Sequence, residues 1–361
     1  MRTNTFRPKS IVLTLFLALT GIVITSLPVK ANVARIVSIE GEVELQRDNW
    51  SRFYRAFSGA DLYGPDLIRP SRGSRVEVLC PNGTTTWIVP AGTISAVNNG
   101  CPGTPARLKP QFGIGDLRGG IDPSLPYVIT PRTGIVLSPR PLLRWNPVEG
   151  AESYTVTLKA RGEVVWQIDT DQTELMYPDD QPDLMPRRLY TLNVMADTGA
   201  SSADEDLALR FNVLTGEQAE EAQVRIDSIN ALDIADELKT LILVEEIYPN
   251  YQLTGAAIHD LEGLIAAGIE TAQIYRLLGD VYLKSGLRLL AEESYVKAIA
   301  LATQSNNLEE QVFAQLGLGT LYLHVGETDR AMRQLHCAQK GASELGDEKL
   351  IESIEETLSQ L

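Results

Sequence analysis

The sequence contains few of the residues on which enzyme chemistry most often depends. Only three histidines and three cysteines occur among its 361 residues. None of the histidines (His259, His324, His336) has a cysteine or carboxylate at the spacing of metal ligands. The sequence also lacks a glycine-rich phosphate loop between a strand and a helix, and a Gly-x-Ser-x-Gly nucleophile motif. We therefore expect a non-enzymatic protein with no metal and no cofactor; a hydrolase built from scattered Ser and Asp residues is the alternative.

Long hydrophobic runs are lacking except near the N-terminus. Three basic residues precede an apolar stretch over 11–27, which Pro28 ends. A membrane-spanning helix needs about 20 apolar residues, so this stretch is short for one. The pattern is typical of a signal peptide. We expect residues 1–31 to be cleaved after Ala31 and the protein to be exported to the periplasm or cell envelope; an uncleaved membrane anchor is the alternative.

The scarce cysteines fit an exported protein. Cys80 and Cys101 fall in one predicted β domain, with 20 residues between them. In an oxidising compartment they would form a disulfide that stabilises the fold by about 3 kcal/mol in the chain-entropy model. Two buried free thiols are the alternative. Cys337 stands alone on a predicted helix, where we expect it to be a small core residue.

The charge is acidic and unevenly distributed. The formal net charge of −15 lies entirely in residues 216–361, which hold 25 acidic and 10 basic side chains. An acidic field repels phosphate backbones, so we expect no nucleic-acid binding there. The field fits a basic protein partner, or simply a soluble surface.

The hydrophobic pattern divides the chain into four parts after the signal segment. Residues 33–100 alternate with period two between glycine-rich turns, which predicts a small all-β domain. The many prolines and glycines of 101–134 predict an irregular connector. Residues 135–214 contain about six or seven short strands, which favours a β-sandwich. From 217 to 361 the period becomes 3.6, so we expect two small all-β domains followed by an all-α array of helical hairpins.

An internal repeat is the strongest signal in the sequence. Leu278-Gly279 and Tyr282 recur forty residues later as Leu318-Gly319 and Tyr322. The same offsets match Gly286, Ala291 and Ala298 with Gly326, Ala331 and Ala338. Counting back by 34 finds an earlier, degenerate copy, in which Tyr248 replaces Tyr282 and Glu245 stands in place of Gly279.

This pattern resembles the tetratricopeptide repeat (TPR) family over residues 238–344. In such a repeat, glycine and alanine let the two helices of a hairpin approach closely, and aromatic residues fill the space between hairpins. A final helix over 348–360 would cap the array. The predicted repeat-packing residues are Leu278, Gly279, Tyr282, Ala291, Tyr295, Ala298, Leu318, Gly319, Tyr322, Ala331 and Ala338.

The same resemblance implies a concave groove, because stacked hairpins form a superhelix. Groove-facing side chains come from the first helix of each hairpin, and their mixed polarity suits an extended peptide or a helix of a protein partner. The alternative is that the array packs only against this chain's own β domains. The predicted partner-binding residues are Gln273, Arg276, Asp280, Lys284, Phe313, Leu316, Thr320, Leu323 and His324.

The two β regions carry resemblances of their own. Residues 33–98 resemble the periplasmic FecR domain, on the matching segments Gly41-Glu42-Val43, Gly59 to Leu62, Ser74 to Val78 and Asn82-Gly83-Thr84. Residues 135–214 are similar to immunoglobulin or fibronectin type III sandwiches. Their expected core aromatics are Trp145, Tyr154, Trp166 and Tyr190. Stacking of a sugar on Trp166, or on Trp87 of the first β region, is the alternative role.

These features together predict a scaffold protein of the bacterial envelope. The helical groove would hold a protein partner in the form of a basic peptide or helix, and the β domains would position that partner. The alternative function is a module that binds a cell-wall polymer or carbohydrate through its β domains, with the repeats serving oligomerisation.

Overall fold

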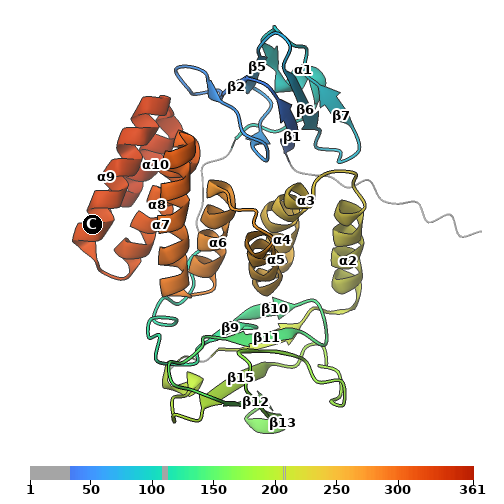
Figure 1. Ribbon diagram of the computed structural model, residues 1–361, viewed down its shortest axis with the longest axis vertical. Helices are drawn as coiled ribbons and strands as arrows, with labels where there is room; N and C mark the ends of the chain where they lie inside the picture. The colour runs from blue at the N-terminus through green and yellow to red at the C-terminus, as the bar shows by residue number, and fades with distance from the viewer. Residues whose placement is uncertain (1–32, 108–112, 206, 208) are drawn as a thin grey trace, which may run out of the picture.

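The computed structural model describes residues 33–107, 113–205, 207 and 209–361. It places one β domain at each end of the long axis and the helices between them (Figure 1). The predicted β-rich N-terminal part and helical C-terminal array are therefore confirmed. The predicted signal peptide, residues 1–31, lies outside the described residues. Among the residues that are described, no helix is both long and apolar enough to cross a membrane.

The N-terminal β domain contains two four-stranded sheets, with strand orders β4-β1-β6-β7 and β3-β2-β5-β8. Alternate side chains of both sheets, such as Ile36 and Ile68, fill a single core. A disulfide joins Cys80 to Cys101. The elements are β1 (Ala34–Glu40), β2 (Val43–Gln46), β3 (Tyr54–Arg55), β4 (Asp61–Leu62), β5 (Leu67–Pro70), β6 (Arg75–Leu79), β7 (Thr86–Ile88), β8 (Ser95–Ala96) and the short helix α1 (Val97–Gly100).

The second β domain also has two sheets, a five-stranded one ordered β10-β16-β15-β12-β13 and a three-stranded one ordered β14-β11-β9. Trp145, Tyr154, Trp166 and Tyr190 are all buried in its core. Its elements are β9 (Val128–Thr130), β10 (Gly134–Val136), β11 (Leu142–Trp145), β12 (Tyr154–Ala160), β13 (Glu163–Thr170), β14 (Glu174–Met176), β15 (Tyr190–Ala196), the 3₁₀ turn η1 (Ser202–Glu205) and β16 (Phe211–Val213).

The connector is shorter than the sequence predicts. We expected irregular chain over 101–134, but Val128–Thr130 forms β9 and pairs with β11 of the second β domain. Valine, isoleucine and threonine favour a strand, and this local preference prevails over the surrounding prolines. The second β domain therefore begins before residue 135.

The helical array follows the second β domain and lies between the two β domains. Its hairpins α6/α7 and α8/α9 stack side by side, and α10 packs on α9. The elements are α2 (Gly216–Asn230), α3 (Asp236–Ile242), the π-helical turn η2 (Leu243–Ile247), α4 (Tyr248–Tyr251), α5 (Thr254–Ala266), α6 (Ala272–Lys284), α7 (Arg288–Ser305), α8 (Leu308–His324), α9 (Thr328–Leu345) and α10 (Glu348–Leu358).

Small residues set the spacing of the hairpins. A Cβ atom added at Gly279 would lie 2.8 Å from the ring of Tyr295, and one added at Gly319 would lie 2.8 Å from the side chain of Leu335. Tyr282, Tyr295 and Tyr322 are at most 4% exposed. Glycine is therefore required at both positions because the second helix of each hairpin occupies the space that a side chain would need.

The degenerate first copy departs from a regular helix where its sequence departs from the repeat. Its first helix is broken into α3, the π-helical turn η2 and α4, and Pro249 lies in the last of these. Such turns insert one residue into a helix and rotate the side chains that follow. Glu245, in place of the packing glycine, lies on this turn.

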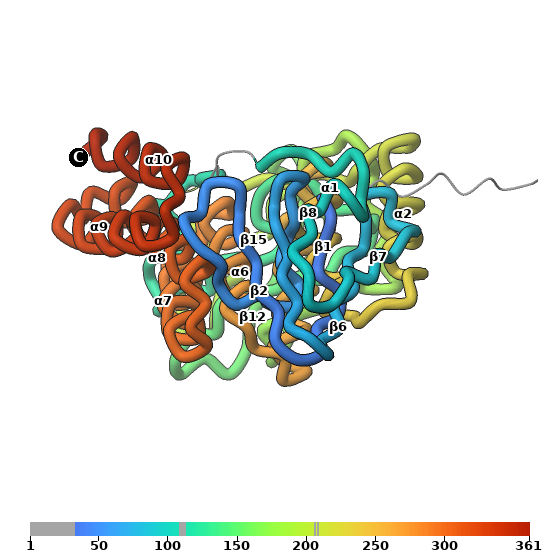
Figure 2. The backbone as a smooth tube through the Cα atoms, turned by 90° about the horizontal axis from the view of Figure 1, so that it is seen from above, coloured from blue at the N-terminus to red at the C-terminus, as the bar shows by residue number. Residues whose placement is uncertain are grey.

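The N-terminal domain lies over the ends of several helices rather than beside one of them. Figure 2, viewed from above, shows β1, β2 and β6 crossing in front of the helical layer. On the other side, the connector passes against the α6–α7 junction, where the Gly115 N–H donates to the Leu283 carbonyl at 3.0 Å. The array is thus in contact with other parts of the chain at both of its ends.

Candidate functional site

Six of the nine predicted groove residues line cavities on the first-helix face of the array. We name these the domain cavity (about 230 Å³), the α6 cavity (about 420 Å³) and the connector cavity (about 480 Å³). The domain cavity lies between the N-terminal domain and α6 and α8, the α6 cavity between α6 and η2–α4, and the connector cavity beside the end of α8. The six residues are Gln273, Arg276, Asp280, Lys284, Phe313 and His324.

The other three predicted groove residues line none of these cavities, and burial corrects the prediction for two of them. Leu316 and Thr320 are 1% and 6% exposed, and Leu323 is half-buried at the edge of the main core. Helix α8 is packed by α6, α7 and α9, so most of its circumference is interior. Leu316 and Thr320 therefore stabilise the array and are not available to a partner from solvent.

The N-terminal domain contacts the array through polar groups. The Ser51 N–H donates to the Leu345 carbonyl at 2.9 Å, and the Tyr54 hydroxyl donates to the Glu344 carbonyl at 2.5 Å. The Gln273 amide donates to the Gly59 carbonyl at 3.3 Å. The predicted groove is therefore partly covered by this chain's own β domain.

A first ion-pair network crosses this contact through Arg35 and Arg276. Nη2 of Arg35, on β1, lies 2.6 Å from an Asp61 oxygen and 2.9 Å from a Glu245 oxygen. The other Glu245 oxygen is 3.6 Å from Nη2 of Arg276. Arg276 also pairs with Asp280 at 2.8 Å and with Glu310 at 2.6 Å. Glu245 thus connects an arginine of the β domain with an arginine of the array.

A second network is formed by Arg47 and Arg107. Arg47 donates to both oxygens of Glu309, at 3.1 and 2.9 Å, and to Asp66 at 2.7 Å. Arg107 donates to Glu309 at 2.9 Å and to Asp347 at 3.2 Å. Bidentate pairing fixes orientation as well as distance. Glu309, the second residue of α8, is therefore held by arginines from two segments outside the array.

Carboxylates outnumber guanidinium groups in the first network. Asp61, Glu245, Asp280 and Glu310 pair with Arg35 and Arg276, and Arg35 also lies 3.8 Å from a Glu246 oxygen. Five carboxylates therefore pair with two guanidinium groups in the part of the chain that the structure describes. Burial raises the pKa of Asp61, although Arg35 opposes this effect. Burial likewise raises the pKa of Asp280 and of Glu310, with Arg276 opposing it in both. The site therefore holds negative charge that its own arginines do not fully compensate.

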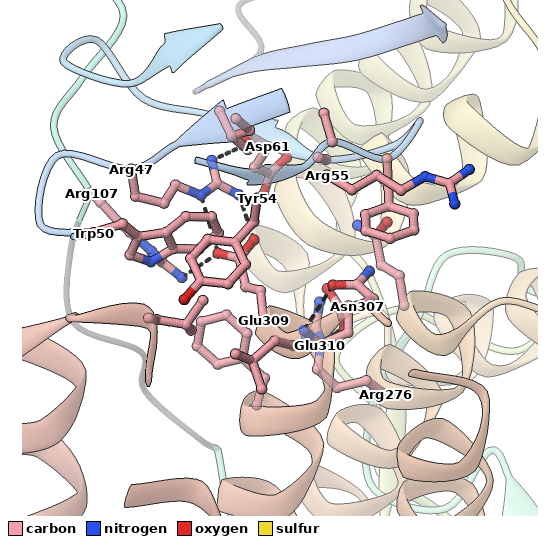
Figure 3. Close-up of a pocket in the computed structure, with 18 of the residues that line it drawn as sticks. Arg47, Trp50, Tyr54, Arg55, Asp61, Arg107, Arg276, Asn307, Glu309 and Glu310 are labelled. Atoms are coloured by element: carbon pink, nitrogen blue, oxygen red, sulfur yellow. Dashed lines mark hydrogen bonds and ion pairs between the residues drawn. The ribbon is translucent and has the colours of Figure 1, made fainter. Parts of the chain in front are cut away.

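The domain cavity has charged and aromatic walls, as the close-up shows (Figure 3). Trp50 and Tyr54 of the β domain face the start of α8, where Asn307, Glu309 and Glu310 lie. Most of the arginines here already stack on aromatic rings, with Arg47 5.6 Å from the centroid of Trp50. The aromatic faces are thus used to hold the charged network in place.

The α6 cavity has a different character. Its walls are mainly apolar and include Val244, Leu277 and Val281. Asp61, Glu245 and Asp280 border it, and the same three carboxylates border the domain cavity. The two cavities therefore meet at one acidic boundary formed by the β domain, η2 and α6.

The opposite end of the array is held by the second β domain. Arg144 of β11 pairs with Glu262 of α5, which also accepts a hydrogen bond from the Tyr282 hydroxyl. Arg132 pairs with Glu205 at 3.1 Å and donates to the Ser285 carbonyl at 3.1 Å. Because Tyr282 is a repeat-packing residue, the contact between domains is tied directly to the interior of the array.

One further expectation is corrected, and one alternative role is excluded. Cys337 is exposed and not a core residue, because it lies on the outer side of α9. Trp166 is 5% exposed and packs edge-on against Tyr177 at 5.7 Å. A sugar cannot stack on a ring that is covered in this way, so Trp166 belongs to the core.

The sequence reasoning missed Arg35, Arg47, Arg107 and Glu245. The arginines occur in strand or connector segments with no local pattern, so nothing marked them. Glu245 did carry a signal, because a charged residue at a packing-glycine position requires a partner elsewhere. Among the described residues, no group of three or more His, Cys, Asp or Glu has the arrangement of a metal site.

Comparisons with known proteins give only distant similarities. No protein-family model and no curated protein matches the chain. It is similar to a solved structure described as "Crystal structure of MamA protein", with 19% identity, a TM-score of 0.28, and coverage of 39% of this chain and 81% of that one. A second, "Crystal structure of MamA", has 18% identity, a TM-score of 0.26, and coverage of 41% and 92%. We draw no argument from similarities this low.

Proposed function

We propose that this protein is a non-catalytic scaffold that binds a protein partner along the first-helix face of its helical array. The observation that carries the proposal is that six predicted groove residues line three cavities on this face. Together with the charged boundary between the first two cavities, they offer both apolar walls and polar anchors, which suits a peptide or helix.

The β domains hold the array at its two ends in this proposal. We assign the N-terminal one as a FecR-like module and the second as an immunoglobulin- or fibronectin-like sandwich. The predicted signal peptide supports export to the periplasm or cell envelope, and the disulfide between Cys80 and Cys101 is compatible with an oxidising compartment. Binding of a cell-wall polymer is less favoured, because Trp50, Trp145 and Trp166 are each at most 5% exposed. Trp87 is half-buried and packs against the core of the N-terminal domain.

A crosslinking pull-down from the native envelope tests the proposal when it compares matched variants. Lys284→Trp with His324→Trp places a bulky side chain at two cavity positions on first helices and blocks them without adding negative charge. Lys297→Trp with His336→Trp makes the same changes on the exposed surfaces of α7 and α9. We expect a protein that is captured by the parent and by the second variant, and lost from the first. Equal capture by all three would overturn the assignment of the binding face.

A further inference from the structure

The α6 cavity combines apolar walls with an acidic border. Its walls are apolar side chains of η2, α4, α5 and α6, and it is bordered by three carboxylates. A purely apolar ligand would leave these carboxylates with only the counter-charge of Arg35 and Arg276, which they already share. A small ion would leave the apolar walls unused. The ligand that satisfies both parts has an aliphatic stem and a cationic end.

Lysine and arginine side chains have this form, because each carries a charged group on a flexible stem of methylene groups. We propose that the α6 cavity takes a single lysine or arginine side chain of the protein partner. The stem would lie against Val244, Leu277 and Val281, and the charged end would reach Asp61, Glu245 and Asp280. The inference rests on the proposed scaffold function and names the chemistry of the partner at this position.

Charge complementarity supports this occupant. Among the described residues, five carboxylates of the first network pair with the two guanidinium groups of Arg35 and Arg276. Lys284 also lines the cavity, but no ion pair joins it to these carboxylates. A cation placed at the boundary would reduce the repulsion between partly buried like charges. The strongly acidic balance of residues 216–361 would in addition attract a basic segment.

The construction of the site explains why the N-terminal domain is part of it. Asp61 belongs to β4, Glu245 to η2 and Asp280 to α6. Arg35 and Arg276 pair with these carboxylates at 2.6 to 3.6 Å. The acidic boundary therefore exists only while the β domain is docked on the array. Undocking would remove Asp61 from the site.

Short peptides test the inference on the full chain. Acetyl-Gly-Gly-Lys-Gly-Gly-amide is compared by calorimetry with peptides that carry arginine, norleucine or glutamate at the central position. We expect the lysine or arginine peptide to bind at least tenfold more tightly than the norleucine peptide, with affinity falling several-fold as the salt concentration rises. Equal affinity of the norleucine peptide would overturn the inference.

Two variants and one control locate the binding. Asp280→Asn removes one charge, and Val281→Phe fills the cavity without a change of charge. Each should weaken lysine-peptide binding at least tenfold, whereas Glu293→Gln on the exposed side of α7 should not. The two variants act through different mechanisms, one by removing charge and the other by filling space. If neither variant weakens binding of the lysine peptide, the site is refuted. The inference can also fail on its own. If capture of a native partner depends on Lys284 and His324 but the lysine peptide does not bind, this inference is refuted and the scaffold function remains intact.

Discussion

Arg47 of the N-terminal domain donates two hydrogen bonds, at 3.1 and 2.9 Å, to the carboxylate of Glu309 in α8. The two residues are 262 positions apart in the sequence. Arg47 is 5% exposed, so the pair is shielded from water and from salt. A contact of this kind reports directly on whether the β domain is docked on the array.

Replacing Glu309 with glutamine should weaken this docking. The change leaves Arg47 and Arg107 with only Asp66 and Asp347 as ionic partners. Removing one partner of a buried ion pair lowers the free energy of unfolding. We expect this free energy to fall by about 2–3 kcal/mol, and not by more, because each arginine retains one carboxylate. Hydrogen exchange should show faster exchange at the start of α8 and in β2.

An exposed ion pair at the same contact provides the control. Arg52 and Glu344 are 3.1 Å apart, with side chains 61% and 53% exposed. Exposed pairs contribute little, so Glu344→Gln should change stability by less than about 0.5 kcal/mol. If the two glutamine variants behaved alike, the buried network would not be what holds the domain.

Adding a methyl group at the packing glycines should destabilise the array. A Cβ at Gly317 would lie 2.6 Å from the Tyr295 ring, closer than the 2.8 Å at Gly279. Tyr295 is fully buried and its hydroxyl donates to Asp280, so the ring cannot move away freely. We expect Gly279→Ala and Gly317→Ala each to cost about 1–3 kcal/mol by overpacking, measured by urea unfolding.

Gly263 of α5 separates this packing effect from helix propensity. Apart from Gly263 itself, its two neighbours in the chain and the nearby backbone of its own helix, no described atom lies within 4 Å of the position that its Cβ would take. Alanine favours a helix over glycine by about 0.8–1 kcal/mol, so Gly263→Ala should stabilise the array. The diagnostic result is that alanine raises the free energy of unfolding at Gly263 and lowers it at Gly279. Destabilisation by alanine at all three positions would contradict the assigned hairpin geometry.

The sequence was informative where structure depends on local spacing. Gly279 and Gly319 recur at a fixed offset and do face Tyr295 and Leu335. A repeat of this kind is readable because each small residue meets a side chain only a few turns away along the same hairpin. The burial of Tyr295 and Ala298 follows from the same local rule.

Contacts between domains left no such pattern. Arg35 lies in β1 and Arg47 directly follows β2, and no repeated spacing in the sequence marks either of them, yet both are buried against the array. Their partners Glu245 and Glu309 lie more than 200 positions away. Charge alone does not select one partner among 47 acidic residues. The repeat predicted nine groove residues, of which six line cavities, but it did not predict that carboxylates of three separate segments meet at the boundary between the cavities.

Loss of the disulfide should destabilise the N-terminal domain. Cys80 and Cys101 close a loop of about 20 residues, for which the chain-entropy model gives about 3 kcal/mol. We expect Cys80→Ala with Cys101→Ala to lose about this amount in urea unfolding, and a reductant to produce the same shift in the parent only. Cys337→Ser, at an exposed position, should have no effect. An identical response of the double variant to reductant would show that another thiol is involved.

Stability should increase as the pH falls from 7 to 5. Burial raises the pKa of Asp61 from 3.8 to about 6, with Arg35, Arg47 and Arg276 opposing the shift and Glu245 reinforcing it. The folded state therefore binds a proton that the unfolded state releases between these values. The stability that this proton contributes is fully present below pH 3.8 and is lost as the pH rises through about 6.

Burial also raises the pKa values of Asp280 and Glu310. For Glu309, burial acts in the same direction, but Arg47 and Arg107 outweigh it and lower the pKa. The Glu309 interaction is lost only below its ordinary pKa of 4.5, so it does not oppose the trend between pH 5 and 7. We expect the free energy of unfolding, measured with urea, to increase by about 1–2 kcal/mol between pH 7 and pH 5. Asp61→Asn should reduce that gain, since the amide does not titrate, while Asp329→Asn on the exposed start of α9 should leave it unchanged. A gain of the same size in Asp61→Asn would mean that the pH dependence arises outside the acidic boundary.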